Sequence, residues 1–338
     1  MESKKKGAKP GGKRVRRRPR VFMTGPLPDR AMRRLRRVYD VAVHEGRRPM
    51  SRRGLLSGLR DAEGLICFPF DSVDAAALDA APRLRVISTY SVGFEHIDVK
   101  RARERGIVVG YTPEVLTEAT ADISVTLMLD LMRRVSEGDR LIRGGGWKCV
   151  FGATDYVGVD LRGKTLGILG LGRIGEAVAR RAAAFGMNIA YHNRHRLSAR
   201  MECGLNARYV GLGRLLSGSD VISVHVPYNG ATHHMFDSGV FARMKRTAYL
   251  INTSRGKVVC EPDLVRALRT GVIAGAGLDV FESEPVGRSS PLVRLPNVVL
   301  APHIGSSTAE TRSEMADLTL RNLDLGLRGQ RPVHSVCW

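Results

Sequence analysis

Short apolar runs alternate with longer stretches of helical periodicity along most of the chain, and this alternation occurs twice. The first set of expected strands covers residues 20–25, 39–44, 63–68, 83–89 and 106–111. The second set covers residues 165–170, 187–192, 220–227, 248–254, 275–281 and 297–303. Strands that are separated by helices form parallel sheets. The pattern therefore predicts an α/β fold with two doubly wound parallel-sheet domains.

A long helical stretch, residues 115–145, lies between the two sets of strands and forms a natural connection between domains. A last helix, residues 306–329, follows the second set, and its simplest placement is back in the first domain. The first domain is then discontinuous in sequence. We expect a disordered basic tail at 1–20, one domain from 21–113 and 305–335, and a second domain from 114–304.

Positive charge is concentrated at the beginning of the chain. The formal net charge is +21 over 338 residues, and the first twenty residues hold ten Lys or Arg and one Glu. This segment has no apolar face and is rich in Gly and Pro, which is typical of disorder. If the protein touches nucleic acid at all, we expect only this tail to do so.

The remaining composition indicates a globular cytoplasmic protein. We find no apolar run long enough to span a membrane, and no apolar core of a secretory signal. The five cysteines are scattered, none forms a CxxC pair, and no Cys/His cluster has zinc-finger spacing. We therefore expect reduced thiols, mostly in the core, and no metal site.

A glycine-rich turn follows the first strand of the second set. The turn reads Gly170-Leu171-Gly172-Arg173-Ile174-Gly175 and opens a helix within one β-α-β unit. In this context the motif is typical of a dinucleotide site, because the helix N-terminus offers free N–H groups to a pyrophosphate. Gly170, Gly172, Arg173, Ile174 and Gly175 are therefore candidate cofactor-binding residues.

The next strand runs into AYHNRHR, residues 190–196. NAD sites place an acid about 20 residues beyond the glycine motif to bind the ribose 2′-hydroxyl. No acid occurs here between Tyr191 and Met201. Arg194 suits a 2′-phosphate instead, with a hydrogen bond from Asn193, so we expect NADPH to be preferred over NADH. The alternative is that these residues are merely solvated.

The later strand ends supply the other candidates, because ligands bind beyond the carboxyl ends of a doubly wound sheet. For ketone reduction, His303 would donate a proton to the carbonyl oxygen while hydride arrives from the nicotinamide. Glu284 would orient that ring and favour its protonated form, and Arg255 would bind a substrate carboxylate and polarise the carbonyl. The cofactor candidates at these ends are His225, Pro227, Thr253, Ser254, Asp279, His303 and Gly305.

Two of those candidates have alternative interpretations. His225 taken alone is more often a structural residue than a ligand. Asp279 suits either the nicotinamide carboxamide or the local structure of the turn.

Several motifs, in order, resemble the D-isomer-specific 2-hydroxyacid dehydrogenases. GILGLGRIG, INTSRG, GAGLDVFESEP and APHIGSSTAETR are similar to the nucleotide domain of that family, and TYSVGFEHID with RGIVVGYTPEVLTEATAD is similar to its substrate domain and hinge. The resemblance covers roughly residues 21–332. It implies a Rossmann nucleotide domain plus a flavodoxin-like substrate domain, with the active site in the cleft between them.

The resemblance also implies residue roles and a partner. Arg255, Glu284 and His303 match the catalytic Arg/Glu/His set of the family, and backbone N–H groups near Val92 and Gly93 would hold the substrate carboxylate. A homodimer would form through the nucleotide domain.

Within the family, VLTEATAD, Trp147 in GGGWK, and YHNR look like glyoxylate/hydroxypyruvate reductases. These reduce a small 2-keto acid to the D-2-hydroxy acid. The alternatives are a dehydrogenase for another 2-hydroxy acid such as 3-phosphoglycerate, or a non-catalytic, nucleotide-sensing, corepressor-like protein. Phe68-Pro69-Phe70 departs from the family's smaller residues. Phe70 would either narrow the substrate pocket or belong to the core.

Overall fold

The computed structural model describes residues 17–46 and 50–337, and the chain divides into two compact units. Of the described residues, unit 1 contains 17–46, 50–89, Asp98–Gly110 and 319–337. Unit 2 contains Tyr90–Ile97 and Tyr111–Leu318. Unit 1 is discontinuous, and the chain returns to it at Thr319. The segment Tyr90–Ile97 belongs to unit 2, although strands of unit 1 flank it in the sequence.

Unit 1 is built on a six-stranded sheet with the order β13-β5-β4-β3-β1-β2. Its strands are β1 (Arg20–Met23), β2 (Asp40–Val43), β3 (Gly64–Cys67), β4 (Val86–Thr89), β5 (Val108–Gly110) and β13 (Ser335–Cys337). The first five are parallel in the flavodoxin-like order 2-1-3-4-5. The strand β13, which the sequence pattern did not predict, pairs antiparallel with β5 at the edge.

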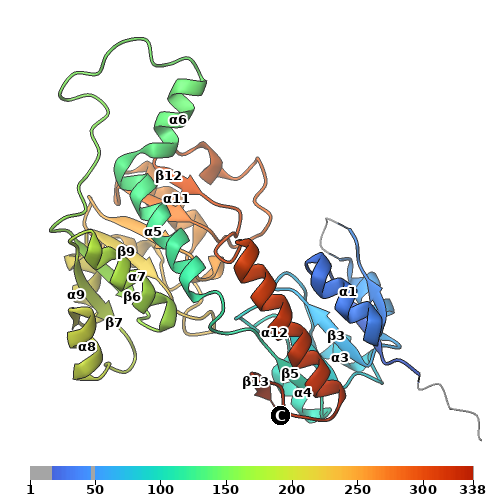
Figure 1. The fold of residues 1–338 in the computed structure, drawn as a ribbon. Helices are drawn as coiled ribbons and strands as arrows, with labels where there is room; N and C mark the ends of the chain where they lie inside the picture. Colours follow the sequence, from blue (N-terminus) through green and yellow to red (C-terminus); the bar gives the residue numbers. More distant parts are fainter. Residues whose placement is uncertain (1–16, 47–49, 338) are drawn as a thin grey trace, which may run out of the picture. The chain divides into compact units, whose positions relative to one another are not determined.

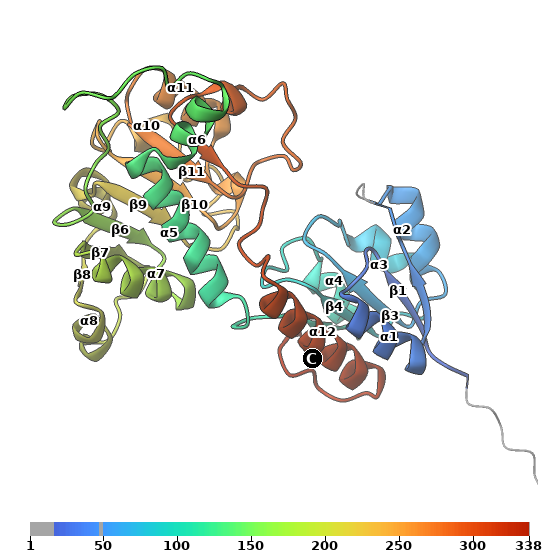
Figure 2. The ribbon, with the colours of Figure 1, turned by 45° about the horizontal axis from the view of Figure 1, so that its top comes forward.

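The helices of unit 1 are α1 (Asp29–Val38), α2 (Arg52–Leu59), α3 (Ala75–Asp79), α4 (Val99–Glu104) and the end of α12 (Ala309–Leu327). The end of α12 packs closely on this sheet: a Cβ at Gly110 would lie 2.9 Å from Cβ of Asn322, and Ser88 Oγ donates to the Thr319 carbonyl at 2.9 Å. Figure 2 shows α12 beside β4. The end of the last helix therefore packs on the first sheet.

Unit 2 is built on a seven-stranded parallel sheet with the order β12-β11-β10-β9-β6-β7-β8. Its strands are β6 (Thr165–Leu169), β7 (Asn188–His192), β8 (Ala207–Tyr209), β9 (Val221–Val224), β10 (Tyr249–Asn252), β11 (Gly275–Leu278) and β12 (Val298–Leu300). This is the Rossmann order with one added strand. The strand order reverses between β6 and β9, and ligands bind beyond the carboxyl ends at that point. The sequence pattern missed β8, which is three residues long.

Helices cover both faces of this sheet (Figure 1). They are α5 (Thr117–Arg133), α6 (Val135–Arg143), α7 (Arg173–Ala184), α8 (Ala199–Leu205), α9 (Leu212–Gly218), α10 (Ser238–Phe241) and α11 (Glu261–Arg269). One apolar cluster joins α5 and α7 to the sheet, and another joins α9, α10 and α11 to it. Burial on both faces explains why the strands are continuous apolar runs.

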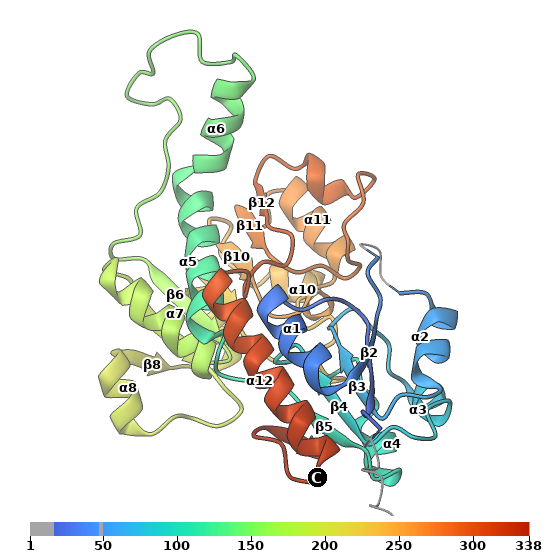
Figure 3. The same cartoon turned by 45° about the vertical axis from the view of Figure 1, so that its right-hand side comes forward.

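The long helical stretch expected at 115–145 is two helices. Arg134 lies between α5 and α6 with φ of 57° and ψ of 36°, the left-handed conformation that ends a helix. Its guanidinium donates to Glu137 at 2.6 Å and lies 4.2 Å from the ring centre of Tyr156. The helix α6 and the loop after it project from the rest of unit 2 (Figures 1 and 3). We call residues 135–160 the arm.

The structure bears on four smaller expectations. The basic tail lies outside the described residues as far as residue 16, but Arg20, assigned to the tail, is the first residue of β1. Phe70 is 56% exposed, so its assignment to the core is wrong. Cys67 and Cys337 are buried, whereas Cys149 and Cys203 are exposed, so the thiols are not mostly in the core. No helix within the described residues has both the length and the apolar character needed to cross a bilayer.

Candidate active site

The glycine turn lies at the switch point of the unit 2 sheet, between β6 and α7. Gly170 has a φ of 96°, and a Cβ there would lie 2.8 Å from the carbonyl carbon of His225. Only glycine therefore allows the backbones after β6 and β9 to approach each other this closely. A Cβ at Gly175 would lie 2.7 Å from the Gly170 oxygen, so glycine is also needed where α7 packs against the turn.

The other residues of the turn leave the helix N-terminus accessible. Gly172 is the N-cap of α7 and no side chain caps the helix. A Cβ at Gly172 would meet no atom within 4 Å. Arg173 is exposed and pairs with Glu114 at 2.8 Å, and Ile174 packs into the α5–α7 cluster. Free N–H groups next to open space fit a phosphate.

AYHNRHR divides into residues with different environments. The amide of Asn193 is engaged with the glycine turn: its Oδ1 accepts from Leu171 N at 2.6 Å and its Nδ2 donates to Leu171 O at 3.2 Å. Arg194 is exposed and forms no hydrogen bond or ion pair with the described residues. Asn193 therefore braces the turn, and Arg194 is the side chain available to an anion.

The nearest acidic residue after AYHNRHR is Glu202, and its carboxylate already has hydrogen-bond partners within the protein. Glu202 accepts two hydrogen bonds from Arg196, at 2.9 and 2.7 Å, and one from the Tyr191 hydroxyl at 2.6 Å. The hydrogen bonds from Arg196 and then Tyr191 lower the pKa of Glu202 to about 2. Glu202 therefore neutralises Arg196 and leaves Arg194 as the uncompensated charge.

His225, directly after β9, is half-buried and hydrogen-bonded to its neighbours. Its Nε2 lies 2.8 Å from Ser223 Oγ, and its backbone N donates to Leu169 O at 2.8 Å. Burial lowers the pKa of His225 to about 4, so the ring is neutral at physiological pH. These contacts agree with the structural interpretation of this histidine. Pro227, two residues later, is exposed.

The loop after β10 is held by a residue that the sequence did not single out. The buried Asn252 accepts from Ser254 N at 3.0 Å and from Ser254 Oγ at 2.9 Å, and its Nδ2 donates to Arg255 O at 3.0 Å. Thr253 Oγ1 lies 2.7 Å from Ser124 Oγ on α5. The backbone that carries Arg255 is thereby fixed from both sides.

Arg255 forms an ion pair with Glu95, a second residue that the sequence did not single out. Its Nη1 also donates to Ser254 O at 2.7 Å. Burial raises the pKa of the Glu95 carboxyl, but the charge and hydrogen bond of Arg255 outweigh burial, and that pKa lies below its usual value. Glu95 is thus a carboxylate at neutral pH and orients the guanidinium.

The expected substrate loop, Val92 and Gly93, belongs to unit 2 and contacts the same guanidinium. A Cβ built at Gly93 would lie 1.8 Å from Arg255 Nη2 and 2.4 Å from Glu95 Oε2. Glycine at this position leaves room for the Arg255 guanidinium and the Glu95 carboxylate in the positions that they occupy. The structure brings together Gly93, Glu95 and Arg255, although Arg255 is far from the other two in the sequence.

His303 and Glu284 form the second pair of the site. Nδ1 of His303 lies 2.7 Å from Glu284 Oε2, and Glu284 Oε1 accepts from Phe281 N at 2.9 Å. The His303 and Glu284 side chains are 29% and 17% exposed, so the pair is reachable from solvent but sheltered. With Nδ1 on the carboxylate, Nε2 is the ring nitrogen that can pass a proton to a ligand.

Asp279 holds the turn that carries His303. Its two oxygens accept from Ile304 N and Gly305 N, each at 2.7 Å, and the side chain is buried. Burial raises the pKa of Asp279, against the opposing effect of these two hydrogen bonds. His303 has a φ of 55°, which a non-glycine residue rarely adopts, and the bonds to Asp279 hold it there. The local-structure interpretation of Asp279 is thereby supported.

Comparisons with known proteins agree with this geometry. Residues 125–305 match the family model of the D-isomer specific 2-hydroxyacid dehydrogenase NAD binding domain. A glyoxylate reductase from Korarchaeum cryptofilum is 46% identical over 319 residues, which are 94% of this chain and 96% of that protein. The crystal structure of the TT0316 protein from Thermus thermophilus has a TM-score of 0.88 at 44% identity, covering 94% of this chain and 99% of the other.

A further structural relative is an NADPH-dependent glyoxylate/hydroxypyruvate reductase from Sinorhizobium meliloti, in complex with NADP and malonate. Its TM-score is 0.82 at 35% identity, covering 94% of this chain and 97% of the other. Together with the glycine turn, the ion-paired arginine and the His–Glu pair, these matches show that the chain belongs to the D-isomer-specific 2-hydroxyacid dehydrogenases and is an NAD(P)-dependent oxidoreductase.

Proposed function

We propose that this enzyme reduces glyoxylate and hydroxypyruvate with NADPH as the preferred cofactor and with His303 as the proton donor. The observation that carries the proposal is the His303–Glu284 pair at 2.7 Å, beyond the carboxyl ends of the sheet that bears the glycine turn. A histidine fixed by a carboxylate is a competent general acid for a carbonyl oxygen.

The glycine turn fits a dinucleotide, because the uncapped N-terminus of α7 leaves N–H groups next to the open space at Gly172, while Gly170 allows the tight backbone turn. When bound, the nicotinamide supplies the hydride. Arg194 binds the 2′-phosphate, since it is exposed and its positive charge is not compensated by Glu202. Asn193 contributes indirectly, by bracing Leu171. Thr253, Ser254 and Gly305 line the same edge of the sheet.

Arg255 binds the substrate carboxylate and polarises the ketone. Glu95 and the Ser254 carbonyl hold its guanidinium in one orientation, which reduces the entropy lost when an anion binds. The backbone N–H groups near Val92 and Gly93 add hydrogen bonds to that carboxylate. Because Gly93 has no side chain, the Arg255 guanidinium lies directly against the loop backbone, so both could bind the same carboxylate.

His303 holds the proton on Nε2 while Glu284 accepts from Nδ1. As negative charge develops on the substrate oxygen, His303 releases this proton to it and the Glu284 carboxylate stabilises the ring in its correct orientation. Asp279 keeps the turn in place through Ile304 and Gly305. We assign the nucleotide domain to unit 2 and the substrate domain to unit 1.

The arm is the proposed dimer contact of unit 2. Its large apolar side chains are exposed to solvent in the single chain: Trp147 is 57% exposed and Val150 is 91% exposed. Trp147, Phe151 and Tyr156 form a row of rings with centroids 6.2 and 5.4 Å apart. Exposed apolar patches of this kind mark association surfaces, and a two-fold dimer is the commonest such assembly.

The test is a panel of 2-keto acids assayed with NADPH and with NADH. We expect the highest kcat/KM for glyoxylate and hydroxypyruvate with NADPH. If pyruvate or 3-phosphohydroxypyruvate gave the highest kcat/KM, or if NADH outperformed NADPH, the corresponding part of the proposal would be wrong.

A further inference from the structure

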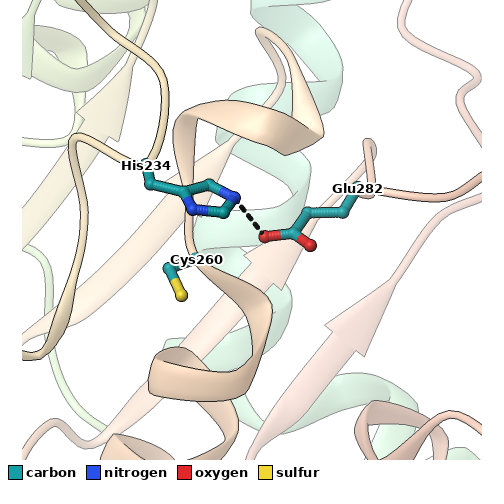
Figure 4. A group of neighbouring side chains, drawn as sticks. All are labelled: His234, Cys260 and Glu282. Carbon is teal, nitrogen blue, oxygen red and sulfur yellow. Dashed lines mark ion pairs between the residues drawn. The ribbon is translucent and has the colours of Figure 1, made fainter.

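Three side chains that can bind a metal gather in unit 2 outside the site described above. They are His234, Cys260 and Glu282, and one ligand atom from each lies within 4.8 Å of the others. Each residue is half-buried. Figure 4 shows the imidazole and the carboxylate facing each other, with the Cys260 side chain below the imidazole and its sulfur directed away from both in this view. Neither the glycine turn nor the His303–Glu284 pair uses these side chains.

Backbone hydrogen bonds hold the first two ligands on paired segments. His234 N donates to Lys257 O at 2.9 Å, and Cys260 N donates to Phe236 O at 2.9 Å. Between them, Phe236 and Val259 form a parallel bridge. His234 and Cys260 therefore keep a constant separation even though they are distant in sequence.

The third ligand is tied to the same place by Glu261, the first residue of α11. Glu282 N donates to Glu261 Oε1 at 2.6 Å, and Glu261 N donates to Glu282 Oε1 at 3.0 Å. His234 Nε2 lies 2.8 Å from that same Oε1. Among the described residues, Oε2 of Glu282 has no hydrogen-bond partner, so this second oxygen is available to a cation.

We propose that His234, Cys260 and Glu282 bind Zn²⁺, with water completing the coordination. Imidazole nitrogen, thiolate sulfur and carboxylate oxygen are the ligand types of protein zinc sites, and three protein ligands plus water is a recognised set. Ligand atoms around a tetrahedral zinc lie about 3.3 to 3.8 Å apart, so the most distant ligand atoms would approach by roughly 1 Å. The contact between His234 Nε2 and Glu282 Oε1 at 2.8 Å would give way to the metal. On binding, the Cys260 thiol releases its proton to solvent and the sulfur–zinc bond forms.

The site would add a metal link among three segments that hydrogen bonds already join in pairs. It would link the 234–236 segment, the start of α11 and the turn that begins at Glu282 and carries Glu284. A ligand that binds only the folded state raises the unfolding temperature. Zinc should therefore raise the Tm of the enzyme whether or not turnover changes, and whatever its substrate proves to be.

A cobalt titration of the full chain under reducing conditions tests the proposal. Co²⁺ takes the same ligands as Zn²⁺ and gives a thiolate-to-metal charge-transfer band. We expect this band to saturate at one Co²⁺ per chain and to disappear when Zn²⁺ is added. Cys260→Ser should abolish the band, and His234→Gln or Glu282→Gln should weaken Co²⁺ binding about tenfold or more.

Cys203→Ser is the matched control, because Cys203 is an exposed thiol of α8 in the same unit. It should keep the full band. A band that persists in Cys260→Ser, or that is absent from the wild type, would overturn the proposal. A second measurement needs no variant: Zn²⁺ should slow the alkylation of Cys260 about tenfold or more while leaving that of Cys203 unchanged. Equal protection of the two thiols would also overturn it.

Discussion

Glu284 holds Nδ1 of His303 at 2.7 Å, and Asp279 holds the two residues that follow His303 through their backbone N–H groups. The imidazole is thus fixed both at its ring and at its backbone. Such double fixation is typical of a group whose function depends on its orientation.

Replacing His303 should remove the proton donor. We expect His303→Ala to lower kcat for glyoxylate by about 10²- to 10⁴-fold, the usual contribution of a general acid, while the KM for NADPH changes little. Glu284→Gln should have a smaller effect, about tenfold or more, because the amide still touches the ring but no longer stabilises its charge. Steady-state kinetics of both variants would check this. Near-normal turnover of His303→Ala would exclude it as the acid.

Replacing Arg255 should affect both binding and chemistry. Charge-assisted hydrogen bonds contribute about 1.5 to 3 kcal/mol, so Arg255→Ala should raise the KM for the keto acid about 10- to 100-fold and lower kcat as well. Steady-state kinetics with varied keto acid would measure both. Arg255→Lys should recover only part of the lost substrate affinity and turnover, because lysine lacks the planar, two-pronged guanidinium.

Glu95→Gln isolates the orienting role of the carboxylate that pairs with Arg255. It should raise the KM for the keto acid but leave the KM for NADPH unchanged. The comparison of the two KM values decides the point: equal rises in both would indicate general damage to unit 2.

Removing Arg194 should act on NADPH alone. Loss of one charge-assisted contact to the 2′-phosphate predicts a rise of about 10- to 100-fold in the KM for NADPH, with the KM for NADH unchanged. Arg200→Ala is a suitable control, since Arg200 is also exposed and carries the same charge. An Arg194→Ala enzyme with an unaltered KM for NADPH would show that another group binds the phosphate.

His225 should make the fold less stable in acid. Its pKa is lowered to about 4 in the folded chain, from an ordinary value of 6.5, so the unfolded chain binds the proton more readily. The stabilisation from the neutral ring is fully present above pH 6.5 and is lost as the pH falls toward 4. Urea unfolding at about pH 7.5 and about pH 5 would measure the free energy of unfolding of the wild type and of His225→Gln. Between these two pH values the variant should lose less of that free energy than the wild type does, and the difference should be on the order of 1 to 2 kcal/mol. Equal losses would contradict this.

The arm should determine the oligomeric state. We expect a wild-type dimer in light scattering and a monomer when Phe151→Asp is combined with Ile142→Asp, because buried charges at an apolar contact are costly. Val293→Asp serves as the control, since Val293 is an exposed apolar residue outside the arm. If the doubly substituted protein were still a dimer, the dimer contact would have to lie outside the arm.

Local patterns in the sequence were enough to predict two parallel sheets, the glycine turn and the absence of an acid before Met201. These features depend on periodicity, on backbone conformations open only to glycine, and on the order of residues along one strand and helix. The same patterns failed where structure is short or depends on a distant partner. They missed the three-residue strand β8 and the antiparallel strand β13, and they treated α5 and α6 as one helix although Arg134 breaks it.

Only the tertiary structure decided how the candidate residues share their contacts. Asn193 lies beside Arg194 in the sequence, yet its side chain hydrogen-bonds the glycine turn. Arg194 is therefore the residue of the two that is available to bind an anion. Glu95 pairs with Arg255 across 160 positions, and no periodicity links them. The physical reason is general: hydrogen bonds and ion pairs depend on distances between side chains. Those distances are set by which strands become neighbours and where loops return, not by spacing along the chain.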